Sequence, residues 1–186
     1  MTGRSSWSKL ARASLVADAG ARRYDPGPIL AAIEAEGVRY VVIGGTAAVI
    51  RGAPYATFDL DITPARDVGN LDRLAAALAR LEARVYGMPD EVAEVFHLDG
   101  KTLANGSAWK FVTSHGELDV ALDPDGTKGY DDLKRDAGTA RVAGLDVPVA
   151  SLADIVRSKA AANREKDRLQ LPLLRRVLEE TRRLES

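Results

Sequence analysis

The sequence predicts an α+β fold, in which a small mixed β-sheet is flanked by helices and followed by a C-terminal helical part. Three observations support this class. Short apolar runs rich in β-branched residues alternate with helical patterns up to residue 150, whereas the pattern after residue 150 is helical only. Apolar residues make up 46% of the chain, enough for a core. Its 186 residues suit one domain with a helical appendage.

The chain divides into three expected segments. Residues 1–25 are polar and mixed, and they would form an N-terminal arm, either as a short helix or as a loose segment. Residues 26–150 would form the core. Residues 151–186 would form helices that pack on this core.

Composition excludes several kinds of site. The chain contains no cysteine, which rules out disulfides, thiolate nucleophiles and cysteine zinc sites. It has two histidines, too few to favour a histidine zinc site. No apolar run reaches about 18 residues, and the N-terminus lacks the pattern of a signal peptide. We therefore expect a cytoplasmic protein with no membrane partner.

The first four elements alternate between helix and strand. A proline start and a glycine stop predict a helix over 28–36. The run VRYVVIGG, residues 38–45, reads as a buried strand. Residues 46–52 allow about two helical turns, and the alternation in ATFDLDIT predicts a second strand over 56–63.

The middle of the chain predicts a long helix and a hairpin. Apolar residues recur at helical spacing over 70–85, where Asn70 is a plausible cap. The segment 90–98 is ambiguous between helix and strand. Residues 107–126 read as two strands joined by a tight turn at His115–Gly116.

A further strand pair and the C-terminal helices complete the pattern. Residues 140–150 predict two short strands with a turn at Gly144. Ser151 followed by Asp154 resembles a capping box, with Asp in place of the usual Glu or Gln. Pro172 suits the first turn of a second helix.

The junction of the first strand with its helix has the character of an anion site. The strand ends in Gly44 and Gly45, and the helix would start at Thr46. Glycine permits close approach to the backbone, and free N–H groups at a helix N-terminus favour a phosphate. A plain turn is the alternative interpretation.

Asp59 and Asp61 form an Asp-x-Asp pair in the second predicted strand. Residues two apart on a strand point to the same face, so both side chains can converge on one divalent cation. Aspartate is unfavourable in strands, which argues for a functional reason. Phe58, Leu60 and Ile62 would then face the core.

A third carboxylate would complete a site for two metal ions. Asp119 lies between apolar residues of a later strand, and Glu117 lies on the same face two residues earlier. We favour Asp119, because Glu117 adjoins the turn. Asp123 and Asp125, in DPDG, are typical turn residues.

The order of these motifs resembles the nucleotidyltransferase superfamily with a polymerase-β-type core, and within it the AbiEii-like and MenT-like toxins of bacterial toxin–antitoxin systems. The resemblance spans residues 37–167. It implies that Gly44 and Gly45 cradle the triphosphate of an NTP substrate. It also implies that Asp59, Asp61 and Asp119 hold two Mg²⁺ ions, with Mn²⁺ as an alternative metal.

The resemblance extends to the helical motif SKAAANREKD. It implies that Lys159 contacts phosphate, and that Asp167 orients this lysine or assists the chemistry. Arg164, or Arg51, would add positive charge at the phosphates. This chain has Gly-Gly where many members have Gly-Ser, so Thr46 or the backbone would replace that serine.

The acceptor is predicted from charge and resemblance together. The net charge is −1, but the basic residues are concentrated near the two ends of the sequence. Residues 157–183 carry nine basic and four acidic side chains, and residues 1–23 carry five basic side chains and one acidic side chain. Such segregation can place a basic surface beside an acidic site. The resemblance implies transfer to the 3′ end of tRNA by a toxin with a cognate antitoxin protein.

Other functions remain open at this level. The acceptor could be a protein or a small molecule of the aminoglycoside type. The chain could be a non-catalytic binding module on the same fold, such as an antitoxin. DLDIT also fits the Asp-x-Asp-x-Thr motif of haloacid-dehalogenase-like phosphatases, in which the first aspartate, here Asp59, is the nucleophile.

Overall fold

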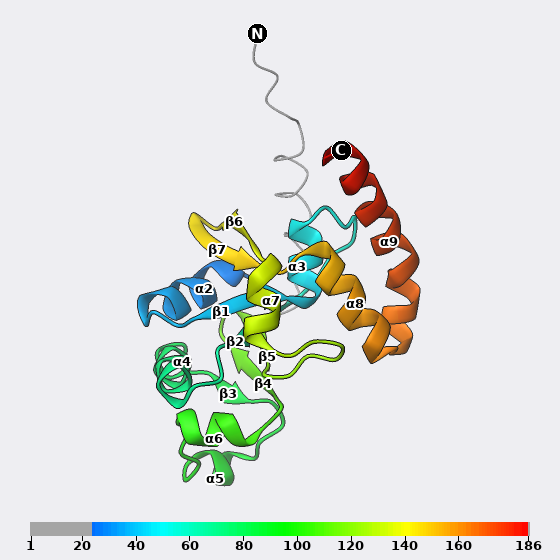
Figure 1. Cartoon of the computed structure of the whole chain (residues 1–186). Helices are drawn as coiled ribbons and strands as arrows, with labels where there is room; N and C mark the ends of the chain where they lie inside the picture. Colours follow the sequence, from blue (N-terminus) through cyan, green and yellow to red (C-terminus); the bar gives the residue numbers. More distant parts are fainter. Residues whose placement is uncertain (1–23, 186) are drawn as a thin grey trace.

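A mixed seven-stranded sheet forms the centre of residues 24–185, the part of the chain that this computed structural model describes (Figure 1). The strands are β1 (Tyr40–Ile43), β2 (Asp59–Pro64), β3 (Arg84–Val85), β4 (Ala108–Thr113), β5 (Gly116–Ala121), β6 (Gly138–Val142) and β7 (Leu145–Val149). The predicted α+β class is confirmed, whereas most of the predicted N-terminal arm, residues 1–23, lies outside the described residues.

Eight helices accompany the sheet in the described part of the chain. They are α2 (Pro26–Ala35), α3 (Gly44–Ile50), α4 (Val68–Arg80), α5 (Asp90–Ala93), α6 (Gly100–Asn105), α7 (Tyr130–Asp136), α8 (Leu152–Ala162) and α9 (Glu165–Glu185). None of the helices in residues 24–185 combines the length and the apolar character needed to cross a bilayer.

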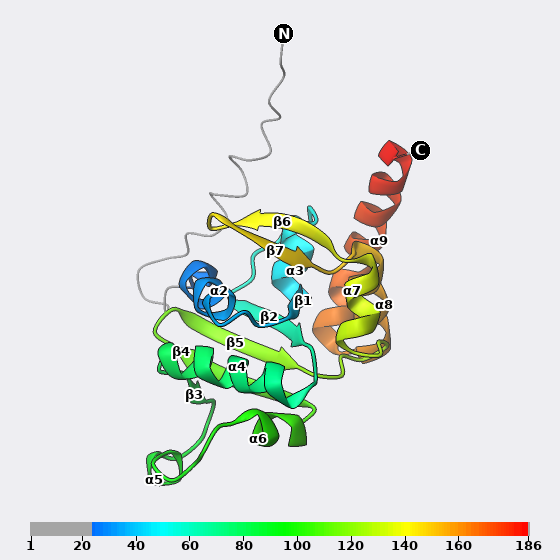
Figure 2. The ribbon, with the colours of Figure 1, turned by 60° about the vertical axis from the view of Figure 1, so that its left-hand side comes forward.

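The strand order is β3-β4-β5-β2-β1-β7-β6, so β2 occupies the centre of the sheet. Its neighbours differ in direction, because β1 runs antiparallel to β2 and β5 runs parallel to it. The predicted hairpins are present as β4–β5 and β6–β7, both antiparallel. Figure 2 shows α2 and α4 in front of the sheet, whereas α7 and α8 lie to the right of it.

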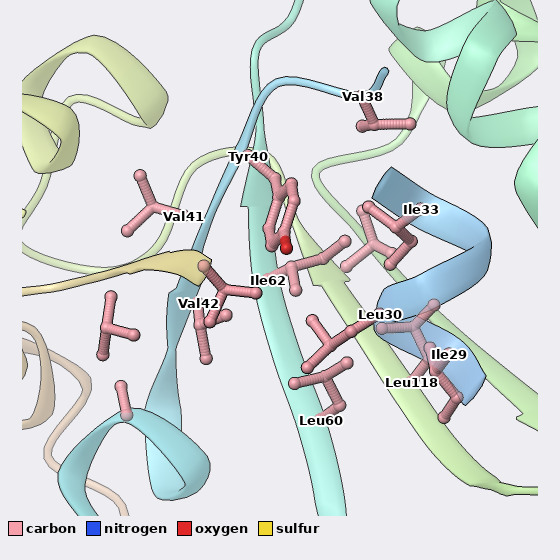
Figure 3. Packing of buried hydrophobic residues seen from close by; sticks show 14 of the residues in the cluster. Ile29, Leu30, Ile33, Val38, Tyr40, Val41, Val42, Leu60, Ile62 and Leu118 are labelled. Atoms are coloured by element: carbon pink, nitrogen blue, oxygen red, sulfur yellow. The ribbon is translucent and has the colours of Figure 1, made fainter. Parts of the chain in front are cut away.

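Acidic and apolar side chains alternate along β2, so the apolar ones point into the core and the acidic ones point to the opposite face of the sheet. Figure 3 shows apolar side chains of α2 facing those of β2 and β5, namely Ile29, Leu30, Ile33, Leu60, Ile62 and Leu118. All six are fully buried. Burying each contributes about 1.5–3 kcal/mol. This packing fixes the orientation of β2 and therefore directs Asp59 and Asp61, which alternate with Leu60 and Ile62, away from α2.

The predicted core position of Phe58 is wrong. The alternation of ATFDLDIT placed it on the same face as Leu60, but β2 begins only at Asp59. Residues before that point do not follow the strand's period, and Phe58 is 58% exposed. Similarly, the helix expected over 70–85 ends at Arg80, and Arg84–Val85 forms the edge strand β3.

The predicted break in the C-terminal helices lies elsewhere. Pro172 does not begin a helix but lies inside α9. The break is at Asn163, which adopts a left-handed conformation and ends α8. Leu171 and Leu174 are both buried on either side of the proline, and this packing keeps α9 continuous despite the missing N–H.

Asn70 is not the predicted N-cap of α4 but a buried residue whose side chain links α4 to the sheet. The cap is Asp67, whose side chain accepts from the Asn70 N–H. The Asn70 amide accepts a hydrogen bond from the Arg39 N–H at 2.7 Å and donates to the carbonyls of Arg39 and Ala65, both at 2.9 Å. It therefore ties α4 to the ends of β1 and β2.

We predict that Asn70→Ala lowers the free energy of unfolding by about 2–4 kcal/mol, because it leaves the Arg39 N–H and the Ala65 carbonyl without this partner and removes one of the two donors to the Arg39 carbonyl. Chemical denaturation would measure the change. The matched control is Asn105→Ala, which alters an exposed amide and should shift stability by less than about 0.5 kcal/mol. Equal effects of the two substitutions would contradict the assigned role of Asn70.

Candidate active site

Strands β2 and β5 bring three carboxylates together on the face opposite α2. Their parallel register places Asp61 beside Asp119. One carboxylate oxygen from each of Asp59, Asp61 and Asp119 lies within 4.8 Å of the others. Oxygen donors grouped in this way are the ligands that Mg²⁺ and related hard cations prefer. The cluster therefore could hold a divalent metal ion.

The surroundings of these carboxylates leave room for a cation. The Thr57 hydroxyl donates to Asp59 Oδ1 at 2.8 Å, and the Gly45 N–H donates to Asp61 Oδ2 at 3.2 Å. Asp119 Oδ1 is buried and makes no hydrogen bond, and the Lys110 ammonium lies 3.5 Å from it. A buried carboxylate oxygen with only this longer ion pair is costly, and a bound cation would lower that cost.

Glu117 and Asp119 share Lys110 as a partner, but Glu117 lies closer to it. The Glu117 carboxylate forms an ion pair with Lys110, Nζ to Oε2 at 2.7 Å. The same ammonium is 3.5 Å from Asp119 Oδ1. Asp119, and not Glu117, is the residue whose oxygen falls within the 4.8 Å cluster.

Gly44 and Gly45 lie at this site and form the first residues of α3, where Thr46 was expected to begin the helix. Gly44 has a φ of +61°, and a Cβ on it would lie 2.0 Å from Asp61 Oδ2. A Cβ on Gly45 would lie 2.5 Å from Thr57 Oγ1. The glycines are therefore required for the close approach of the carboxylates and their supports, independently of any phosphate.

Thr46 supports the strand from behind. Its hydroxyl donates to the Asp59 carbonyl at 2.8 Å and is 2.8 Å from the Tyr24 hydroxyl. The side chain is buried and does not line the pocket described below. The structure thus assigns its hydroxyl to holding β2 against α3.

Arg51 is not brought to the carboxylates. Its Nε donates to the Ala150 carbonyl at 3.0 Å, and its Nη2 donates to the carbonyls of Val149 at 2.6 Å and Gly138 at 3.3 Å. These bonds use the guanidinium to join α3 to the β6–β7 hairpin. Nε and Nη2 already serve backbone carbonyls and Arg51 does not line the cavity described below, so the structure adds no support to the expectation that Arg51 faces phosphate.

A cavity of about 430 Å³ opens beside the carboxylates. Its walls come from β2, from the segment before β2, and from α8 and α9. The following charged and glycine residues predicted from sequence line it: Gly44, Gly45, Asp59, Asp61, Glu117, Lys159, Arg164 and Asp167. Its volume is in the range of small-molecule and cofactor sites.

Lys159 and Asp167 meet although eight residues separate them. Sequence spacing on one continuous helix allowed only partial convergence, but the left-handed Asn163 reverses the chain between α8 and α9. Lys159 Nζ is thereby 3.0 Å from Asp167 Oδ1. Asp167 is 2% exposed, and its Oδ2 has no hydrogen-bond partner. Arg164, by contrast, pairs at the surface with Asp125 at 3.3 Å.

Sequence reasoning missed several residues of the cavity. Tyr55, Phe58, Lys166 and Gln170 line it, and the Tyr55 hydroxyl and Gln170 Oε1 are buried without partners. The signal for Lys166 was its place in the charged motif beside Asp167. Periodicity offered no signal for Tyr55 or Phe58, because the segment before β2 is irregular.

Electrostatics at the cluster favour a bound proton or a cation. Burial, together with the charges of Asp59 and Asp119, raises the pKa of Asp61 to about 7, although the Gly45 N–H and Lys166 lower it. Burial also raises the pKa of Asp119, against the effect of Lys110. Perturbed carboxylates in a cavity are characteristic of functional sites.

Comparisons with known proteins agree with this geometry at the level of fold. No family model matches the sequence, and no curated protein matches it. The antibiotic-resistance factor ANT(2'')-Ia, in solution, has a TM-score of 0.53 at 18% identity over 81% of this chain and 80% of that one. Its crystal structure with adenylyl-2''-tobramycin has a TM-score of 0.52 at 17% identity, over 81% of this chain and 86% of that one.

A third similar structure is the lincosamide antibiotic adenylyltransferase LnuA with lincomycin bound. Its TM-score is 0.50 at 18% identity, over 80% of this chain and 93% of that one. Together these structures show that the chain has the fold of the nucleotidyltransferases.

We predict that Asp61 makes the metal-free protein less stable as the pH rises. Its folded-state pKa of about 7 exceeds the unfolded value near 3.9, so the folded state retains a proton between these values. The resulting stabilisation is full below the unfolded pKa and is lost as the pH rises through about 7. Thermal melts in EDTA from about pH 5 to pH 8 should show a fall that is nearly complete above about pH 7 and that Asp61→Asn reduces.

Saturating Mg²⁺ should restore the melting temperature of the wild type at about pH 8 and should leave Asp61→Asn nearly unchanged. An identical pH dependence in the two metal-free proteins would contradict this account.

Proposed function

We propose that the protein transfers a nucleoside monophosphate from an NTP to an acceptor hydroxyl and releases pyrophosphate. The observation that carries the proposal is the group of three carboxylate oxygens within 4.8 Å of one another on a nucleotidyltransferase fold, where Asp59 and Asp61 line the cavity and Asp119 does not. In the reaction, the acceptor oxygen bonds to the α-phosphorus, and the bond to the pyrophosphate oxygen breaks.

Asp59, Asp61 and Asp119 would hold Mg²⁺ in this reaction, up to two ions with the nucleotide. When bound, the metal would neutralise phosphate charge and lower the pKa of the acceptor hydroxyl. The protein's own part is to position these carboxylates. Thr57 and Gly45 orient two of them through single hydrogen bonds, which leave further oxygen lone pairs for ligation.

Lys159 would bind the phosphates from the opposite wall. Its ammonium is mostly buried, with 12% of the side chain exposed, and its partner Asp167 is nearly fully buried. The pair fixes the lysine at the cavity, so little conformational entropy would be lost on binding. Lys166 and Arg164 add positive charge at the same wall. Phe58, exposed at the cavity, would stack on a base.

We predict that Asp59→Asn and Asp61→Asn each lower NMP transfer by roughly 10³-fold, because a neutral amide ligates a hard cation poorly. Lys159→Ala should cost less, about 10–10²-fold. Incubation with total RNA and each α-labelled NTP in turn would measure transfer and identify the labelled species. Asp146→Asn, which changes an exposed strand aspartate paired with Arg141, is the matched control.

Full activity of both aspartate variants would refute the proposed reaction. A chain that binds no NTP in the presence of Mg²⁺, as measured by calorimetry, would instead be a binding module.

We propose RNA, at the 3′ end of tRNA, as the acceptor. The support is the basic character of α9, on which Arg168, Arg175 and Arg182 are exposed and recur every seven residues. Residues seven apart lie on nearly the same side of a helix, so the three form one basic stripe. Such a stripe suits a phosphate backbone.

We predict that the double variant Arg175→Ala/Arg182→Ala weakens RNA binding and leaves NTP binding unchanged. The slope of log K against log salt should fall by about 1.4–1.8, since each phosphate contact contributes about 0.7–0.9. Arg84→Ala/Arg141→Ala removes the same charge from other surfaces and should leave the slope unchanged. Equal slopes for the wild type and the α9 variant would argue against this acceptor surface.

A small-molecule acceptor is the second candidate. The cavity of about 430 Å³ is large enough for one, and two structures of similar fold hold lincomycin or adenylyl-2''-tobramycin. Labelling of an added aminoglycoside in place of RNA would favour this candidate.

The proposed cellular role is that of a toxin with a cognate antitoxin, from the resemblance to the AbiEii-like and MenT-like proteins. Growth arrest on expression of the wild type, with Asp61→Asn as the inactive comparison, tests this role.

A further inference from the structure

Lys110 lies against the carboxylate cluster from the neighbouring strand. It is on β4, directly opposite Asp119 of β5 in the antiparallel register. Its Nζ is 2.7 Å from Glu117 Oε2 and 3.5 Å from Asp119 Oδ1. The three side chains are about one-third exposed, so water screens their charges only in part.

Tyr86 also contacts Lys110. The ammonium is 5.6 Å from the centre of the Tyr86 ring. The Tyr86 N–H also donates to the Lys110 carbonyl at 2.8 Å, which fixes the two backbones relative to one another. An ammonium that contacts both carboxylates and an aromatic ring is restrained more than one in a simple surface ion pair.

Because of Lys110, one divalent ion leaves a single net negative charge at the cluster, and a second ion would make the net charge positive. Glu117 and the three clustered aspartates supply four negative charges when ionised. Lys110 offsets one of these, and a single divalent ion offsets two more. A second ion at Asp119 would lie close to the ammonium, and like charges at that distance repel.

We propose that Lys110 is a built-in cation of the site, which limits the nucleotide-free protein to one divalent ion on Asp59 and Asp61. Asp119 would then take part in binding a second ion only when a triphosphate supplies further negative charge. The inference rests on the metal site of the proposed function, but it concerns the number of ions bound before any reaction.

Titration of the nucleotide-free protein with Mn²⁺, followed by the electron paramagnetic resonance signal of the free ion, tests the proposal. We expect one bound ion in the wild type. Lys110→Met should bind a second ion, or bind the first at least tenfold more tightly. Lys110→Arg retains the charge and should behave as the wild type. Lys101→Met, at an exposed position of α6, is the control for the loss of a lysine.

The outcomes separate this role from the proposed function. One ion bound with equal affinity by the wild type and Lys110→Met overturns the role of Lys110 and leaves the metal site intact. Two ions in the nucleotide-free wild type also overturn it. No Mn²⁺ binding by the wild type, Lys110→Met or Lys110→Arg overturns the metal site, and the proposed function with it. A thermal melt of each variant verifies that it is folded.

Discussion

The parallel pairing of β2 with β5 places Asp61 beside Asp119, and the rest of the site depends on this pair of like charges. Two carboxylates this close, with a third nearby, are unfavourable without a counter-charge. The structure meets that cost with few donors: one N–H from Gly45, one hydroxyl from Thr57 and the ammonium of Lys110. The remaining negative charge is what makes the cluster attractive to a cation.

The apolar packing on the other face of the sheet offsets the repulsion between these carboxylates. Leu60, Ile62 and Leu118 are fully buried beneath the side chains of α2, and they hold β2 and β5 in register. A slip of one residue would bury the aspartates and expose the leucines, at a cost far above the repulsion at the site. The apolar residues between the aspartates therefore stabilise the fold and orient the carboxylates at the same time.

The wall opposite the carboxylates depends on a local break in the helices. Asn163 ends α8 in a left-handed turn, so α9 folds back and Asp167 reaches Lys159. Without that turn, the two residues would lie eight positions apart on one helix, about 12 Å along its axis. The cavity between the two walls is thus a product of the strand register on one side and of one backbone conformation on the other.

The class of fold and the short-range pattern of the site could be predicted from the sequence. The periods of two and 3.6 residues located most strands and helices, and the spacing of Asp59 and Asp61 placed both on one face of a strand. These features are local, because they follow from side-chain direction within single elements.

Packing of the folded chain sets which distant residues meet. Packing placed Asp119 beside Asp61 through strand register and brought Lys110 to Glu117. It also turned the Arg51 side chain toward backbone carbonyls and left Phe58 exposed. Long-range pairing has no period along the chain, since it depends on which strand lies beside which and on where a helix ends. The physical reason is that local spacing fixes the direction of a side chain, whereas packing fixes its neighbours.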